Sequence, residues 1–329
     1  MKKLIRSLIA LSLAAVLSAC GASPEKTTAA PGTDPAGQKT FTVGICQLLQ
    51  HPALDAATKG FRDALEKALP GQVVFEEKNA SGEPANCSTI VNGFISSKVD
   101  LIMANATPAL TAAASATSEI PILGTSITAY GVALDIADFS GTVGGNISGT
   151  SDLADLQAQA AMVKEWFPNA KNVGLLFCSA EANSRYQVDE VGKALAALGF
   201  SCTEFAFTDT NDLAAVTQNA ALKSDVIYIP TDNTAANNAE SIANILLAAK
   251  VPAVCGEEGI CAGCGVCTLS ISYYDLGVTT GEMAARILKG EADIAKMPVE
   301  YTTASKKYNK AFCDQFGLTP PEGYEAIAQ

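Results

Sequence analysis

The sequence has few of the residues on which several classes of function depend. Its 329 residues include one histidine, His51, one tryptophan, and 22 lysines and arginines against 34 aspartates and glutamates. A single histidine excludes any mechanism that needs two, and a net charge of -12 repels phosphate backbones, so we expect no nucleic-acid partner. The motifs G-x-S-x-G, P-loop and H-E-x-x-H do not occur. We therefore expect a protein that is not an enzyme and that binds no metal and no cofactor.

Long apolar segments are also scarce. The run at 8–17 is too short to span a bilayer, and it follows three basic residues and leads into the sequence LSAC, which ends at Cys20. This pattern predicts a lipoprotein signal peptide over residues 1–20 with lipid on Cys20; a plain secretory signal with a coincidental cysteine is the alternative. Residues 21–40 carry Pro, Gly, Thr and Ala but no large apolar side chain, so we expect a flexible linker there. The protein would then be lipid-anchored at the extracytoplasmic face of the cell membrane.

From residue 41 onward, short β-branched runs alternate with amphipathic stretches. The runs that predict strands lie at 41–47, 73–77, 101–105, 121–124, 172–178, 202–207, 225–230 and 251–256. Alternating strands and helices form parallel sheets covered by helices, and two such series in one chain predict two doubly wound lobes. The fold class is therefore α/β.

Small hydroxyl and amide side chains gather where the predicted strands end. They occupy the loops 47–52, 105–108, 124–128, 179–184 and 231–234. Each loop has an ordinary explanation, because such residues cap helix N-termini. However, ligands of parallel sheets bind at this edge, and helix N-termini attract carboxylates. Asp232 would attract an ammonium group, so the loops together predict a cleft for a zwitterion.

Several sequence motifs occur in an order that resembles one known family. They are LSAC before residue 21, GICQ at 44–47 followed by HPALDA at 51–56, EANS at 181–184, SYYDLG at 272–277 and ILKG at 287–290. They resemble substrate-binding lipoproteins of ABC importers, in the branch of tryptophan- and tyrosine-binding proteins. The resemblance implies a type I periplasmic-binding-protein fold, with two lobes joined by a three-crossover hinge. The lobes would comprise residues 41–148 plus 272–296 and residues 149–271 plus 297–329.

The same resemblance implies a monomer that captures a small solute and delivers it to the permease and ATPase subunits of an importer. The solute is expected to be an aromatic amino acid: tyrosine, tryptophan or phenylalanine. The ligand carboxylate would be held by Asn105, Thr107, Thr125, Ser126 and Thr128. The ammonium would meet Asp232, with Glu257 or Glu258 in reserve.

The remaining expected site residues surround these groups. By the resemblance, Gln47 and His51 would lie at the mouth of the cleft and face Asn183 and Ser184. The ligand side chain would lie against Leu48, Leu49, Tyr186 and Tyr273, although each of these is also an ordinary packing residue.

Other readings of the chain stay open at this stage. The solute could be a branched-chain amino acid, a purine or a sugar-like compound, and a surface adhesin or ligand sensor could use the same fold without transport. A sugar is less favoured because aromatic platforms are few. The cluster Cys255, Cys261, Cys264 and Cys267 is not required by the family, and it could form disulfides, remain as free thiols or bind a metal.

Overall fold

The computed structural model describes residues 39–328. The predicted signal peptide, Cys20 and nearly all of the predicted linker lie outside the described residues. The folded chain from Lys39 onward forms one compact unit. Among its helices, none is both long and apolar enough to cross a membrane.

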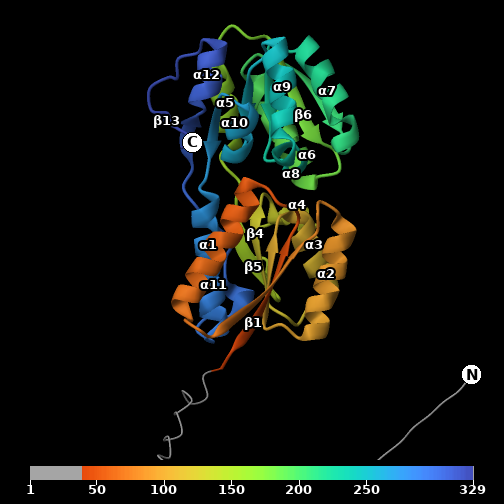
Figure 1. Ribbon diagram of the computed structural model, residues 1–329, viewed down its shortest axis with the longest axis vertical. Helices are drawn as coiled ribbons and strands as arrows, with labels where there is room; N and C mark the ends of the chain where they lie inside the picture. The colour runs from red at the N-terminus through yellow and green to blue at the C-terminus, as the bar shows by residue number, and fades with distance from the viewer. Residues whose placement is uncertain (1–38, 329) are drawn as a thin grey trace, which may run out of the picture. The chain divides into compact units, whose positions relative to one another are not determined.

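The first sheet has six parallel strands in the order β11-β5-β4-β3-β1-β2 (Figure 1). These strands are β1 (Phe41–Gln47), β2 (Val73–Asn79), β3 (Leu101–Asn105), β4 (Ile122–Ile127), β5 (Ile147–Ser151) and β11 (Glu300–Tyr301). The helices of this lobe are α1 (Pro52–Ala68), α2 (Pro84–Ser97), α3 (Thr107–Ala116), α4 (Tyr130–Ala133), α11 (Tyr273–Leu288) and the short η1 (Ile294–Lys296). Helices α1 and α11 cover one face of the sheet and α2 and α3 the other, over two separate apolar clusters.

The second sheet has seven strands in the order β13-β12-β10-β9-β8-β6-β7, all parallel to their neighbours except the β10–β12 pair. These strands are β6 (Asn172–Cys178), β7 (Ser201–Phe207), β8 (Val226–Ile229), β9 (Ala253–Cys255), β10 (Cys267–Ser270), β12 (Ser305–Tyr308) and β13 (Glu325–Ala326). The helices are α5 (Leu156–Trp166), α6 (Ala182–Ala197), α7 (Thr210–Lys223), α8 (Asn233–Asn237), α9 (Ala239–Ala249), α10 (Glu258–Cys264) and α12 (Lys310–Phe316).

The chain passes between the two sheets three times. It crosses after β5, after β10 and after β11. The predicted α/β class, with two doubly wound lobes and three crossovers, is therefore confirmed. The lobe limits were expected after residues 148 and 296. In both places the first sheet extends beyond the expected limit, because β5 continues to Ser151 and β11 pairs with β5.

Helices α1 and α11 pack closely because of their glycines. A Cβ atom added at Gly60 would lie 2.1 Å from the Tyr274 carbonyl oxygen, and one at Gly277 would lie 2.0 Å from the Ala57 carbonyl oxygen. Only glycine allows two backbones to approach this closely. The close packing holds the first residues of both helices, and with them His51 and Tyr273, at the same end of the lobe.

The segment around the cysteine cluster is regular secondary structure, although it is rich in glycine. It forms α10 and β10, because Glu257 caps the helix and the apolar residues of α10 are buried in the second-lobe core. All four cysteines are buried free thiols. Within the described residues, no group of three or more His, Cys, Asp or Glu side chains is arranged to hold a metal ion.

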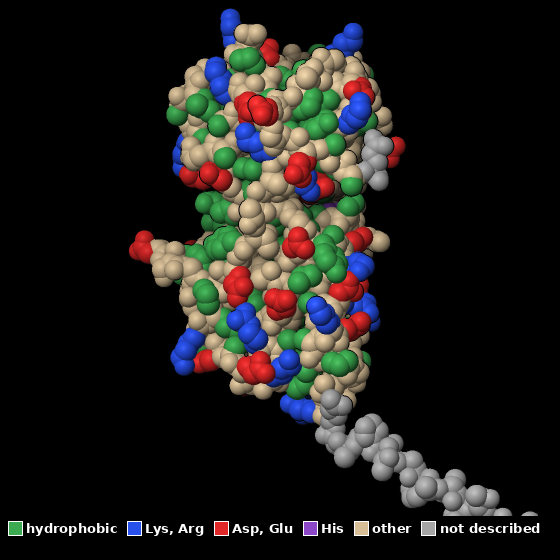
Figure 2. Space-filling model, turned by 90° about the vertical axis from the view of Figure 1, so that its left-hand side faces the viewer, with side chains coloured by type: hydrophobic (Ala, Val, Ile, Leu, Met, Phe, Trp, Pro, Cys, Tyr) green, Lys and Arg blue, Asp and Glu red, His purple; other side chains and the backbone are tan. Residues whose placement is uncertain are grey.

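Figure 2 shows the side chains on one face of the molecule. Acidic and basic side chains alternate over this face, and hydrophobic ones gather around its mid-height. The face shown carries no extended patch of one charge, in keeping with the many short-range ion pairs at the surface, such as Arg185 with Glu204.

Candidate functional site

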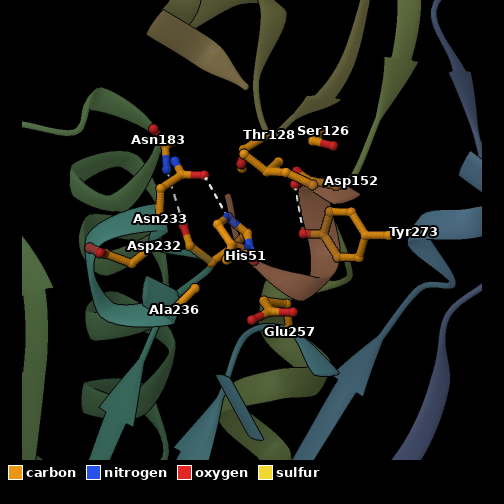
Figure 3. A pocket seen from close by; sticks show the side chains of 12 residues that line it. His51, Ser126, Thr128, Asp152, Asn183, Asp232, Asn233, Ala236, Glu257 and Tyr273 are labelled. Carbon is orange, nitrogen blue, oxygen red and sulfur yellow. Dashed lines mark hydrogen bonds between the residues drawn. The ribbon is translucent and has the colours of Figure 1, made fainter. Parts of the chain in front are cut away.

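A small polar cavity lies between the two lobes (Figure 3). The free space at its centre is about 10 Å³, close to what one water molecule needs. The side chains around it come from the end of β4, the crossing after β5, and the starts of helices in both lobes. They are His51, Leu54, Ser126, Thr128, Asp152, Asn183, Thr231, Asp232, Asn233, Ala236, Glu257 and Tyr273.

Several residues that the sequence singled out do meet at this cavity. They are His51, Ser126, Thr128, Asn183, Asp232, Glu257 and Tyr273. The strand-end loops of a parallel sheet converge at one edge, and the two lobes bring two such edges together. The location predicted from the loops therefore agrees with the position of this cavity.

Gln47 and Asn105 lie beside the cavity, inside the first lobe, and not in its lining. The Gln47 amide donates to the Leu49 carbonyl at 2.8 Å and accepts from the Thr58 hydroxyl at 2.6 Å. The Asn105 amide donates to the Leu54 carbonyl at 2.9 Å and to the Thr58 hydroxyl at 3.0 Å. These bonds tie β1 and β3 to the first turns of α1, so both side chains position the helix that carries His51.

Thr125, Thr107 and Ser184 are likewise outside the lining. The Thr125 hydroxyl lies 3.3 Å from that of Thr150 and 3.2 Å from that of Thr280, deep within the lobe. Thr107 opens α3, where its carbonyl accepts from Thr111, and Ser184 is fully buried beneath Asn183. Polar loop residues of this kind can stabilise the fold without lining the cavity, and sequence alone does not separate the two uses.

Asp232 is a helix cap. One of its oxygens accepts from the Cys178 backbone N–H at 2.7 Å and the other from the Ala235 N–H at 2.8 Å, at the first turn of α8. Burial, together with the nearby Glu181 charge, raises the pKa of Asp232 well above its usual range. Asp232, which was expected to meet the ligand ammonium, therefore already accepts a backbone hydrogen bond on each carboxylate oxygen.

Glu257 has the same role at α10. Its carboxylate accepts from the Gly259 N–H at 2.6 Å and from the Ile260 N–H, and burial raises its pKa to about 7. The other reserve residue, Glu258, pairs with Lys307 and is not part of the cavity lining.

Asp152 is the residue that the sequence interpretation missed. It is 5% exposed, and one carboxylate oxygen accepts from the Tyr273 hydroxyl at 2.8 Å. Within the described chain its other oxygen, Oδ1, has no hydrogen-bond partner. Burial raises the pKa of Asp152, and the Tyr273 and Thr128 hydroxyls oppose that rise. The available signal in the sequence was its position directly after the strand 147–151. That strand is itself hard to recognise, because it consists mostly of glycine and small polar residues.

His51 joins the two lobes. Its Nε2 lies 3.3 Å from the Asn233 Oδ1, and the Asn233 amide nitrogen donates to Glu181 at 2.7 Å, which fixes the amide orientation. The His51 Nε2 must then carry the hydrogen. Burial lowers the pKa of His51, so the ring is neutral and its Nδ1 is an acceptor, without a partner among the described residues.

The expected slot for the ligand side chain is only partly present. Leu48 and Leu49 line a separate groove that also contains Glu181, and Tyr186 lines another beside Tyr130. Only Tyr273 contacts the cavity, and its hydroxyl is committed to Asp152.

Comparison with known proteins agrees with this architecture. The family described as ABC transporter substrate binding protein matches residues 42–328. A tyrosine-binding protein of Clostridioides difficile (strain R20291) is 30% identical over 302 residues, which cover 91% of this chain and 87% of that protein.

Solved structures give the same result. A domain from Streptococcus pneumonia in complex with L-Trp has a TM-score of 0.83 at 30% identity, over 88% of this chain and 100% of that one. A ligand-free, open substrate-binding protein with adhesive properties from Clostridium difficile has a TM-score of 0.68 at 32% identity, over the same shares. The chain therefore belongs to the family of ABC transporter substrate-binding proteins and has their type I periplasmic-binding-protein fold.

Proposed function

We propose that this protein is the extracytoplasmic receptor of an ABC importer and that it captures an aromatic amino acid between its lobes. The observation that carries the proposal is the buried Asp152, whose unpartnered oxygen faces a cavity built from both lobes. A buried carboxylate oxygen without a donor is costly, and a ligand ammonium would remove that cost. The aromatic side chain is supported by the tyrosine-binding and L-Trp-bound relatives.

The polarity of the ligand follows from the side chains around the cavity. Its ammonium would lie against Asp152, at the crossing between the lobes. Its carboxylate would lie toward the hydroxyls of Ser126 and Thr128 at the end of β4. Ser126 has a φ of +56° and a hydroxyl without a partner in the described chain, so the local backbone is held in a conformation that turns this residue into the lining.

The lobes must separate before a ligand can enter. About 10 Å³ of free space does not accommodate an amino acid, and the chain superposes better on the L-Trp complex than on the ligand-free, open relative. Both observations indicate a closed arrangement of the lobes. Ligand contacts with both lobes would favour a closed arrangement that leaves room for the ligand over an open one, and the permease would bind the closed face.

Lipid on Cys20 would hold the receptor at the membrane next to that permease. Labelling with a radioactive fatty acid tests this: the label should appear on the intact protein and disappear in Cys20→Ala. Label retained in Cys20→Ala would contradict the anchor.

A thermal-shift screen tests the ligand. The protein is first unfolded and refolded to remove carried-over ligand, then heated with each of the twenty amino acids, with nucleobases and with simple sugars. The proposal predicts the largest rise in melting temperature with tyrosine, tryptophan or phenylalanine. A rise with another class alone would replace the ligand, and no rise with any compound would favour an adhesin that does not transport.

A further inference from the structure

The hydrogen-bonding groups around the cavity are mostly acceptors. Three atoms there have no partner among the described residues and can only accept: Asp152 Oδ1, Asn183 Oδ1 and His51 Nδ1. His51 Nδ1 is in this group because Nε2 uses its hydrogen toward Asn233. An ammonium offers three N–H donors, whereas a carboxylate offers none.

The backbone donors at the helix starts in the second-lobe part of the lining are already used. The N–H groups at the start of α8 donate to Asp232 and Glu181, and those at the start of α10 donate to Glu257. Helix α6 begins without a side-chain cap, but Glu181 is its N-cap residue and the Ser184 hydroxyl interacts with Asp232. An anion there would meet two carboxylates.

The lining offers no cation to a ligand carboxylate. The carboxyl groups of Asp152, Asp232 and Glu257 line the cavity, and none of the described residues that line it is a lysine or an arginine. All three are at least 95% buried, so water screens them little. In the first lobe, the unpartnered hydroxyl of Ser126 and the hydroxyl of Thr128 are the side-chain donors left for a ligand carboxylate.

We infer that the cavity recognises the ligand primarily by its ammonium group, so that aromatic primary amines without a carboxylate form a second class of ligand. This inference rests on the proposed aromatic amino-acid site and extends it. Loss of the carboxylate removes only its contacts with the Ser126 and Thr128 hydroxyls, in a lining without a lysine or an arginine. Loss of the ammonium leaves Asp152 Oδ1 buried without a donor.

Calorimetric titration of the refolded, ligand-free protein tests the inference with matched compounds. The first series is tyrosine, tyramine and 3-(4-hydroxyphenyl)propanoate, and the second is tryptophan, tryptamine and 3-(indol-3-yl)propanoate. The amine is expected to bind within about tenfold of its amino acid, and the acid at least about 100-fold more weakly. Because the protein is unmodified, the comparison does not depend on a variant that folds.

The outcomes separate the inference from the proposed function. An amine that binds at least tenfold more tightly than the matching acid supports the inference, even if neither amino acid binds, in which case the proposed amino-acid ligand falls. An acid that binds as tightly as the amine overturns the inference while the amino-acid site stands. If none of the six compounds binds, both fall.

A variant pair adds a second readout. Asp152→Asn should weaken the amine and narrow the gap between amine and acid to less than tenfold. Asp138→Asn is the matched control, because Asp138 is exposed and has a φ of +53°, which asparagine also adopts readily. An unchanged gap in Asp152→Asn would overturn the role of Asp152 in selecting the ammonium.

Discussion

The two lobes use helix starts at the cavity in different ways. In the second lobe, the N-cap residues Asp232 and Glu257 accept hydrogen bonds from the first turns of α8 and α10. In the first lobe, the N-cap residue His51 makes no such bond to α1 and instead reaches Asn233 across the cavity. Helix capping thus uses first-turn donors of α8 and α10 and leaves the first turn of α1 without a side-chain cap. We propose that this difference orients a bound zwitterion, with its carboxylate toward the first lobe.

The largest effect is expected from Asp152, which lies on the crossing between the lobes. Asp152→Asn removes the charge that would meet the ligand ammonium, so amino-acid affinity should fall by about 2–4 kcal/mol. Calorimetric titration measures this, with Asp138→Asn as the control. An affinity within threefold of the original protein would remove Asp152 from the site.

Asp232 should show its structural role more than a binding role. Asp232→Ala removes the acceptors of the Cys178 and Ala235 N–H groups, so the free energy of unfolding should fall by about 1–3 kcal/mol. Ligand affinity should change by less than tenfold. Urea unfolding followed by Trp166 fluorescence gives the stability, and a large loss of affinity without loss of stability would restore Asp232 as the ammonium partner.

His51 should contribute a smaller amount, through closure of the lobes. His51→Ala breaks the hydrogen bond to Asn233, and a single bond of this kind contributes about 0.5–1.5 kcal/mol. We therefore expect a threefold to tenfold loss of ligand affinity. The neighbouring exposed Gln50→Ala serves as the control. Equal affinities in the two variants would show that the His51–Asn233 contact does not stabilise the closed form.

The smallest effect is expected on the pH dependence of stability, through the cap residue Glu257 of the second lobe. Burial raises the pKa of Glu257 from 4.5 to about 7 in the folded protein. A raised carboxyl pKa stabilises the fold fully below the ordinary value and loses that contribution as pH rises through 7. The melting temperature of the ligand-free protein should therefore fall between pH 5 and pH 8.

Two glutamine variants isolate the source of this pH dependence. Glu257→Gln should flatten the fall, since glutamine keeps an oxygen for the α10 cap and does not titrate. The exposed Glu240→Gln should leave it unchanged. Identical pH profiles for both variants would assign the effect to other groups.

The sequence predicted the buried part of the fold better than its edges. The strands 41–47, 101–105 and 172–178 were predicted with their observed bounds, because their residues are almost all buried and apolar. The strand at 147–151 was missed, because most of its residues are small and polar and do not form a hydrophobic pattern. They are buried because of the strands beside them. The antiparallel strand β12 was missed for a similar reason, because it is polar and held by β10.

The position of the cavity could be predicted from the sequence, but the roles of its residues could not. Strand-end loops pointed to the edge where the cavity lies because parallel topology brings them together. Whether Asp232 binds a ligand or caps a helix depends on the Cys178 N–H, which lies 54 residues away in sequence. Asp152 carries no local motif, and its importance arises only where both lobes and Tyr273 enclose it.

A ligand ammonium is proposed to lie beside Asp152. A crystal structure of the protein with tyrosine or tryptophan would test this position. We expect the ligand nitrogen within about 3 Å of Asp152 Oδ1, with the ligand carboxylate toward Ser126 and Thr128. A ligand carboxylate placed against Asp152, or an amino acid bound outside this cavity, would contradict it.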